Sequence, residues 1–138
     1  MEKISRNQEN FIIMTVIYDE LSDYTAGNSA FRDVNEIILQ ITDIPLNEHS
    51  TYVQNCIASV LSHYGEIVSA FQPCLRGWVW ERLPLLTRAV LLMSYAHFYY
   101  VEKIDKSIVI NVAVDLAKKY IEEKQAKFVN AILDEVLN

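Results

Sequence analysis

The chain has 138 residues, of which 51% are hydrophobic and 22% are charged, and its formal net charge is −6. This composition excludes a disordered chain and a strongly basic one, and the length predicts a single domain over residues 1–138. The longest nearly apolar run, Ala89 to Val101, is too short to cross a bilayer. The first residues lack the apolar core of a signal peptide, so we expect a cytoplasmic protein without membrane contact.

The charge is spread unevenly along the chain. Residues 1–75 carry three basic and ten acidic side chains, whereas residues 76–138 carry nine basic and eight acidic ones. Nucleic-acid-binding proteins usually show a basic footprint, which the chain as a whole does not have. Any contact with RNA is therefore expected to be local or shared with a partner.

The first helix is predicted over residues 5–24. Ser5 and Gln8 have the spacing of a capping box at its start. Apolar residues recur at helical spacing, which predicts one face toward the core. That face comprises Phe11, Met14, Tyr18 and Leu21.

Two further helices are predicted before the middle of the chain. One covers residues 31–42 and ends before a proline. The other starts at Asn47 or Ser50 and runs to about Phe71 as one long helix. Gly65 inside it predicts a bend or a close approach of another helix.

A broken segment with prolines and a glycine follows, and it contains both tryptophans, Trp78 and Trp80. Two tryptophans in a connector indicate a hinge filled by aromatic packing between two helical halves. Pro84 suits the first turn of the next helix, predicted over residues 85–101.

Residues 107–137 predict two consecutive amphipathic helices with a polar break at about residues 121–125. Asn111 and Asn130 interrupt their apolar runs, and a buried amide is tolerated only when it is hydrogen-bonded. We therefore expect both amides to tie one segment to another. The apolar positions of the two helices are Ile108, Val112, Ala113, Leu116, Ala117 and Tyr120, then Phe128, Val129, Ile132, Leu133, Val136 and Leu137. The whole pattern predicts an all-α fold of about six or seven helices.

Several short motifs in the second half agree in order and spacing with one known family. They are INVAVDLAKKY (residues 110–120), KFVN (127–130) with Leu133-Asp134, WERL (80–83) and RAVL (88–91). Together they resemble the NusB family over roughly residues 80–134. The first half resembles that family only in length and helical character.

The resemblance implies a compact NusB-like helical bundle and a non-enzymatic function. Members of the family are transcription antitermination factors. They pair with the ribosomal protein NusE and bind the single-stranded boxA sequence of nascent ribosomal RNA, and so act on RNA polymerase through the antitermination complex. The expected partners are accordingly NusE and boxA-type RNA, and the expected effect is to promote ribosomal RNA transcription.

Lysines surround the break between the last two helices, and Phe128 lies beside them. Lysine neutralises phosphate and an aromatic ring stacks on a base, so this combination suits single-stranded RNA. The residues alone favour an ordinary solvated face with Phe128 in the core. The resemblance favours RNA, because the family's KFVN segment lies at its RNA-binding surface. The predicted RNA-binding residues are Lys124, Lys127 and Phe128, with Lys3 and Arg6 at the N-terminus.

Three departures from the family pattern concern charge. The family's arginine-rich first turn is reduced to Lys3 and Arg6, which predicts weaker affinity and a shallower salt dependence. Val112 and His97 replace two family carboxylates. The remaining polar candidates for the surface that binds the protein partner are Glu81, Arg82 and Arg88. The alternative for the two arginines is simple pairing with Glu81.

Two other functions stay open on the sequence. One is a helical interaction module that keeps the NusB fold without RNA binding, with a variant that resembles the NusB-like domain accompanying RNA methyltransferases. The other is an enzyme using His97 and a tyrosine. The sequence shows no metal-ligand spacing, phosphate loop or paired catalytic carboxylates, so we expect no catalytic residues, metal or cofactor.

Overall fold

The computed structural model describes residues 3–28 and 30–138, and these residues form helices, turns and loops without a β-strand. The predicted all-α fold is confirmed. The helices are α1 (Arg6–Thr25), α2 (Val34–Thr42), α3 (Thr51–Ser62), α4 (Tyr64–Phe71), α5 (Leu85–Ala96), α6 (Lys106–Tyr120) and α7 (Glu123–Val136). Short 3₁₀ turns cover Leu46–Glu48, Gln72–Cys74 and Trp80–Arg82, and a π-helical turn covers His97–Val101.

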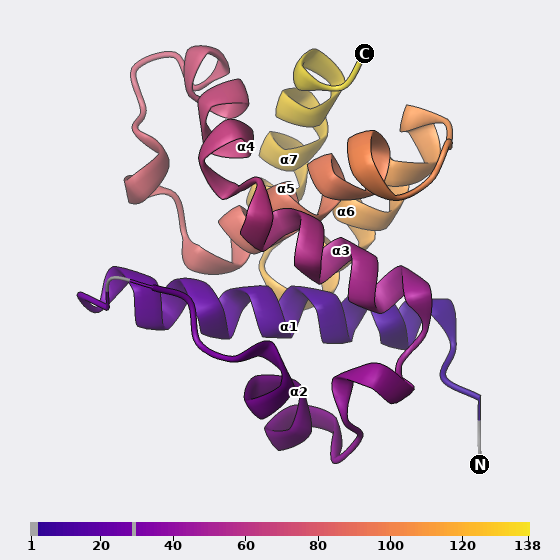
Figure 1. Ribbon diagram of the computed structural model, residues 1–138. Helices are drawn as coiled ribbons and strands as arrows, with labels where there is room; N and C mark the ends of the chain where they lie inside the picture. The colour runs from indigo at the N-terminus through magenta and orange to yellow at the C-terminus, as the bar shows by residue number, and fades with distance from the viewer. Residues whose placement is uncertain (1–2, 29) are drawn as a thin grey trace.

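Helix α1 lies across the molecule with α2 on one side and α3 and α5 on the other (Figure 1). Its start is the predicted capping box: the Ser5 hydroxyl accepts from the Gln8 amide at 3.2 Å, and the Gln8 side chain accepts from the Ser5 amide at 2.8 Å. Because α1 packs on two sides, its buried residues exceed one stripe. Met14 and Leu21 are buried as predicted, whereas Phe11 is 36% exposed. Ile12, Ile13, Val16 and Ile17 are buried outside the predicted face.

The prediction of one continuous helix from residue 50 to 71 is wrong, because a single residue divides it into two helices. His63 ends α3 and caps α4, and its φ and ψ of −113° and 17° lie outside the helical range. The change of direction allows α3 to pack on α1 and α5 while α4 packs on α5 and α7. Gly65 lies just after this break, and a Cβ added there would meet nothing within 4 Å, so a close helix approach does not explain the glycine.

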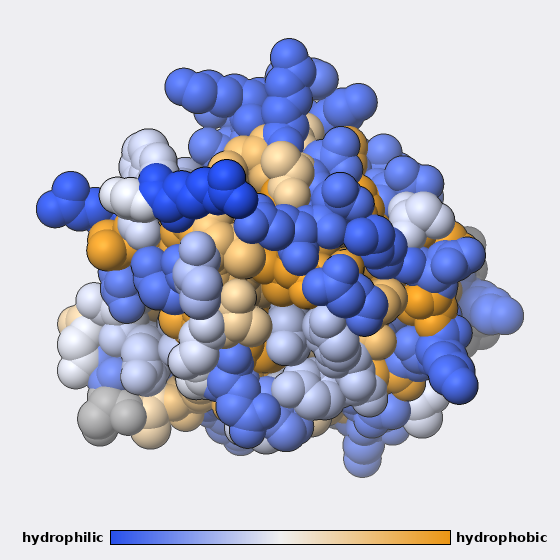
Figure 2. All heavy atoms as spheres, turned by 90° about the horizontal axis from the view of Figure 1, so that it is seen from above, coloured by the Kyte–Doolittle hydropathy of each residue, from blue (hydrophilic) through white to orange (hydrophobic). Residues whose placement is uncertain are grey.

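Helices α6 and α7 form the predicted C-terminal pair and pack along each other. Their connection is shorter than predicted, because α6 ends at Tyr120 and α7 begins at Glu123. Ile108 is 49% exposed, so its placement in the core is wrong, and Val109 and Ile110 are buried instead. Seen from above, the molecular surface is mainly hydrophilic, with apolar surface between the polar side chains (Figure 2).

The prediction that Asn111 and Asn130 are buried amides is also wrong, since both are exposed. Each asparagine directly follows a buried apolar residue, but the side chains of successive residues in a helix point about 100° apart. Adjacency to core residues therefore does not place an amide in the core.

A buried carboxylate lies in α1. Glu20 is fully buried, and its Oε1 accepts a hydrogen bond from the Arg32 backbone amide at 2.7 Å. Its Oε2 is buried without a hydrogen-bond partner among the described residues. Burial raises the pKa of Glu20 to about 6, because the charged form is poorly solvated there.

This raised pKa predicts a pH-dependent effect of Glu20→Gln. The folded protein binds the Glu20 proton more tightly than the unfolded chain does, so the carboxyl's contribution to stability declines as the pH rises from about 4.5 to about 6. The glutamine does not titrate. The stability of the variant relative to the native protein should therefore increase by about 1 kcal/mol between pH 5 and pH 7.5. Urea unfolding of both proteins at the two pH values measures this, and a difference that does not change with pH would contradict it.

Candidate functional site

The start of α7 and the connector before α5 enclose an open cavity of about 320 Å³. Lys124 and Phe128 are one helical turn apart and lie on the same face of α7. The opposite wall comes from the connector. The lining residues are Trp78, Arg82, Leu83, Pro84, Lys124, Gln125 and Phe128. The structure thus brings Lys124 and Phe128, predicted for RNA, to the same cavity as Arg82, predicted for the protein partner.

The cations of this surface are not neutralised by neighbours in the described part of the chain. Neither Arg82 nor Lys124 has an ion pair or a side-chain hydrogen bond there, and the same is true of the exposed Lys127. Arg76 is different, because its guanidinium contacts the Glu135 carboxylate at 2.8 Å. Positive charge is therefore available at the Lys124 end of the cavity and balanced at the Glu135 end of α7.

The tryptophan that lines the cavity was not predicted as a site residue. Trp80 is 1% exposed and stacks on Phe71 at 5.5 Å between ring centroids, so the predicted aromatic filling is correct for this residue. Trp78, in contrast, is 60% exposed. No signal in the sequence separates the two, because both lie in an irregular segment without a periodic pattern.

The N-terminal cations lie apart from this cavity, at the other end of α6. Arg6 contacts Glu9 and Glu102, each at 3.3 Å, and its guanidinium lies 3.7 Å from the centre of the Tyr52 ring. Glu102 precedes α6, whereas Lys124 follows it. Lys3 is exposed on a cavity that Glu9 and Glu48 also line, and it has no ion pair among the described residues. Of the two predicted N-terminal RNA contacts, Arg6 is therefore already paired with carboxylates and Lys3 is not.

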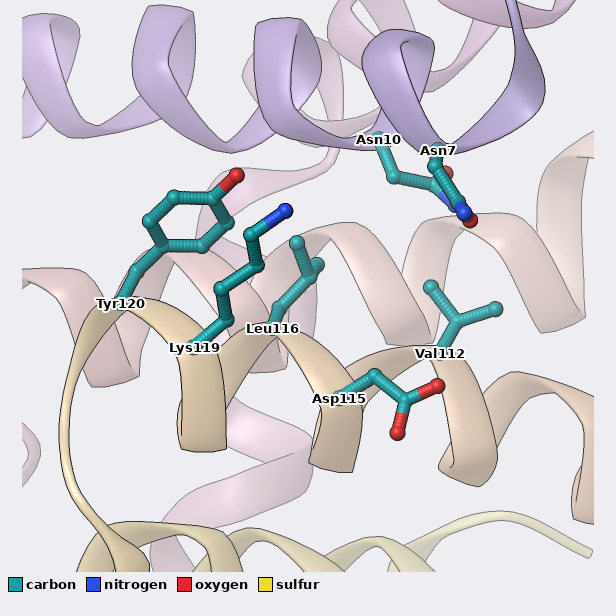
Figure 3. Close-up of a pocket in the computed structure, with 7 residues that line it drawn as sticks. All are labelled: Asn7, Asn10, Val112, Asp115, Leu116, Lys119 and Tyr120. Carbon is teal, nitrogen blue, oxygen red and sulfur yellow. The ribbon is translucent and has the colours of Figure 1, made fainter.

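A smaller groove separates α1 from α6 (Figure 3). Asn7 and Asn10 border it from α1, and Asp115, Lys119 and Tyr120 border it from α6. The Tyr120 ring packs against Phe11 of α1 at 4.9 Å between centroids. Lys119 reaches into this groove, with its Nζ 5.4 Å from the Tyr120 ring centre. The groove ends at Tyr120, the last residue of α6.

The predicted partner-binding residues divide into two groups. Glu81 and Arg82 are exposed on the connector. Arg88 is only 6% exposed, and its Nε donates to the Leu83 carbonyl at 3.0 Å. Burial lowers the pKa of its guanidinium. Its prediction as a surface contact is therefore wrong: Arg88 fastens the start of α5 to the connector, because the helix packs this side chain inward. Pairing of either arginine with Glu81 is not observed among the described residues.

His97 belongs to a buried polar network rather than to an open site. It is 4% exposed, its Nε2 lies 2.7 Å from Glu102, and its ring lies 5.1 Å from that of Tyr52. The Glu102 backbone amide donates a hydrogen bond to the His97 carbonyl at the end of the π-helical turn. This bond brings Glu102 close to the histidine side chain. A buried and engaged imidazole gives the enzyme hypothesis no accessible base. Across the described residues, no three His, Cys, Asp or Glu side chains are grouped to hold a metal ion.

Within residues 3–28 and 30–138, no helix has both the length and the apolar character needed to span a membrane. The model of the NusB family matches residues 12–138.

The chain is similar to several known proteins of that family. The transcription antitermination protein NusB of Halalkalibacterium halodurans is 29% identical over 90 residues, which are 65% of this chain and 67% of that protein. The structure of T. maritima NusB superposes with a TM-score of 0.80 at 21% identity, covering 98% of this chain and 92% of that one. A crystal structure of the antitermination factors NusB and NusE in complex with dsRNA superposes with a TM-score of 0.74 at 22% identity, covering 95% and 94%.

These observations define the class of the protein. It is an all-helical bundle with a surface that combines aromatic rings and cations. The family match extends over most of this bundle, from α1 to the C-terminus. The chain belongs to the NusB family.

The network around Glu102 predicts the outcome of Glu102→Gln. Hydrogen bonds from His97 and Arg6 lower the pKa of Glu102, so its charge stabilises the fold above the ordinary carboxyl pKa. That stabilisation is lost as the pH falls through the lowered value. Because the groups are partly exposed, we expect the variant to be less stable by about 1 kcal/mol or less at pH 7, and the difference to shrink by pH 3.5. Urea unfolding measures it, with Glu48→Gln as an exposed control. An equal loss of stability at both pH values would show that the charge of Glu102 is not the cause.

Proposed function

We propose that this protein is a NusB-like transcription antitermination factor. In this proposal it binds boxA-type single-stranded RNA together with the ribosomal protein NusE and promotes ribosomal RNA transcription within the antitermination complex of RNA polymerase. The observation that carries the proposal is the surface at the start of α7, where Lys124 and Lys127, which have no ion pair among the described residues, lie beside the aromatic ring of Phe128. The relatives named as antitermination proteins and the similar NusB–NusE complex support it.

The chemistry of such binding divides between charge and stacking. Lys124 and Lys127 neutralise phosphates, and release of the counterions makes this contribution dependent on salt. Phe128 is half-buried, so its ring is held by the core while its free face can stack on a base. Binding of this kind needs no cofactor or bond-making residue, and it places the protein in the cytoplasm, where nascent transcripts are made in bacteria.

The net charge of −6 explains why a partner is required in this proposal. A chain with few unpaired cations attracts RNA weakly, whereas a basic partner adds phosphate contacts beside it. Glu81 and Arg82 on the exposed connector are the proposed contacts for that partner. Thermodynamic linkage then requires RNA to strengthen partner binding by the same factor as the partner strengthens RNA binding.

A second function is favoured by one observation, the pairing of Arg6 with Glu9 and Glu102. A NusB-fold protein whose N-terminal cations are neutralised internally could serve as a protein-interaction module with weakened or lost RNA binding. The two functions differ in whether RNA affinity depends on sequence and on NusE.

Fluorescence anisotropy of labelled boxA-type RNA separates them. The protein is titrated with and without NusE at two salt concentrations, beside a scrambled RNA. The antitermination function predicts salt-sensitive, sequence-dependent binding that is strongest with NusE. Binding of NusE without any change in RNA affinity would instead support the interaction module.

Lys127→Ala tests the phosphate contact. Loss of one neutralised phosphate should weaken RNA binding and reduce the slope of log affinity against log salt by about 0.7, the value for one contact to a single strand. Lys103→Ala is the matched control, because Lys103 is an exposed lysine before α6, at the opposite end of the α6–α7 pair. Equal slopes for both variants would show that Lys127 does not contact RNA.

A further inference from the structure

The exposed ring of Trp78 is the largest apolar side chain that the fold leaves open. It is 60% exposed, and the next residue, Val79, is 45% exposed. A tryptophan can bury 150–250 Å², roughly, so leaving it in water forgoes a large favourable contribution. Exposed aromatic surface beside polar residues is typical of a binding site. Trp78 therefore needs an explanation that the packing of this chain does not supply.

The connector holds Trp78 in place. The Trp78 amide donates to the Leu75 carbonyl at 3.1 Å, and the Gln72 side-chain amide donates to the Trp78 carbonyl at 3.0 Å. The Trp80 backbone amide donates to the oxygen of the same Gln72 side-chain amide at 3.2 Å. The ion pair between Arg76 and Glu135 fastens the connector to α7. The backbone that carries the ring is thus preorganised, which reduces the entropy lost on binding.

We propose that Trp78 and Phe128 hold an unpaired RNA base in the cavity between them, with Arg82 and Lys124 on the adjoining phosphates. This inference rests on the proposed function, and it extends that function by adding the connector to the RNA surface. The cavity of about 320 Å³ is in the size range of sites for small molecules and is lined by both rings. Aromatic rings stack on bases of any sequence, so this pocket contributes affinity rather than sequence preference.

The distribution of charge favours RNA over a protein partner here. Both cations on the cavity, Arg82 and Lys124, have no ion pair among the described residues, so they are available for phosphate. Glu135 lines a second cavity, which Trp78 and Phe128 also line, and its carboxylate is already paired with Arg76. The lining of the cavity itself therefore combines two cations and two aromatic rings with no carboxylate, which is the combination that single-stranded RNA requires.

Tryptophan fluorescence tests the contact directly, because the chain has only two tryptophans and Trp80 is buried. The protein, with NusE present, is titrated with unlabelled boxA-type RNA. Stacking on Trp78 should quench and shift the emission. In Trp78→Phe the remaining emission from Trp80 should not change on RNA addition, while anisotropy should show affinity close to that of the native protein, because phenylalanine still stacks.

Affinity measurements complete the test. Trp78→Ala should lose about tenfold in RNA affinity, within the range measured for removal of one stacked base. Val79→Ala is the matched control, because Val79 is the neighbouring exposed side chain but does not line the cavity with Phe128. It should bind RNA as the native protein does. Circular dichroism of each variant checks that the helices are retained.

The possible outcomes separate this inference from the proposed function. In one outcome RNA binds, Lys127→Ala weakens the binding, RNA does not quench the Trp78 emission and Trp78→Ala does not lower the RNA affinity. The inference is then wrong and the proposed function stands. If NusE alone quenches Trp78 and Trp78→Ala weakens NusE binding instead of RNA binding, the pocket is a protein contact and the inference is wrong. If RNA does not bind the native protein with NusE present, both fail.

Discussion

The packing of α1 against helices on two sides is the interaction on which the rest of the structure depends. Ile13, Val16 and Ile17 are buried within it, and α2, α3 and α5 all contact this one helix. Glu20 of the same helix is buried beside the segment that joins α1 to α2, and burial raises its pKa because the carboxylate loses its water. Helix α5 is thereby positioned, and α6 and α7 pack on α5. The surface at the start of α7 thus depends on a core that lies far from it in the sequence.

Local charge, rather than total charge, determines which cations of this acidic protein remain available to an anionic ligand. Carboxylates pair with Arg6 at the N-terminus, and Glu102 contacts both Arg6 and His97. At the start of α7 the opposite holds, because Lys124 and Arg82 lie beside aromatic rings without acidic partners in the described residues. A surface pair of opposite charges contributes little to stability, but it changes which cations remain available to a ligand. The Arg6 guanidinium is therefore engaged within the chain, while Arg82 and Lys124 have no ion pair among the described residues.

The departures of this chain from its family have a common structural setting. His97 stands where the resemblance implies a carboxylate, and the π-helical turn brings Glu102 to the imidazole from five residues away. Glu102 also places a negative charge beside Arg6. Val112, the other replacement, borders the groove between α1 and α6 beside Asp115. Both changes lie along the N-terminal half of α6 and its contacts, away from the cavity that contains Phe128.

Helical periodicity and short motifs in the sequence determined the fold class, most helix positions and the family, because these properties depend on neighbours along the chain. The capping box at Ser5 is local in the same way and was predicted correctly. Only the tertiary structure decided which side chains face water. It buried Arg88, exposed Asn111, and separated Trp78 from Trp80, because burial depends on which helices pack together from distant parts of the chain. For the same reason Arg82 and Lys124, 42 positions apart, share one cavity that no sequence spacing indicates.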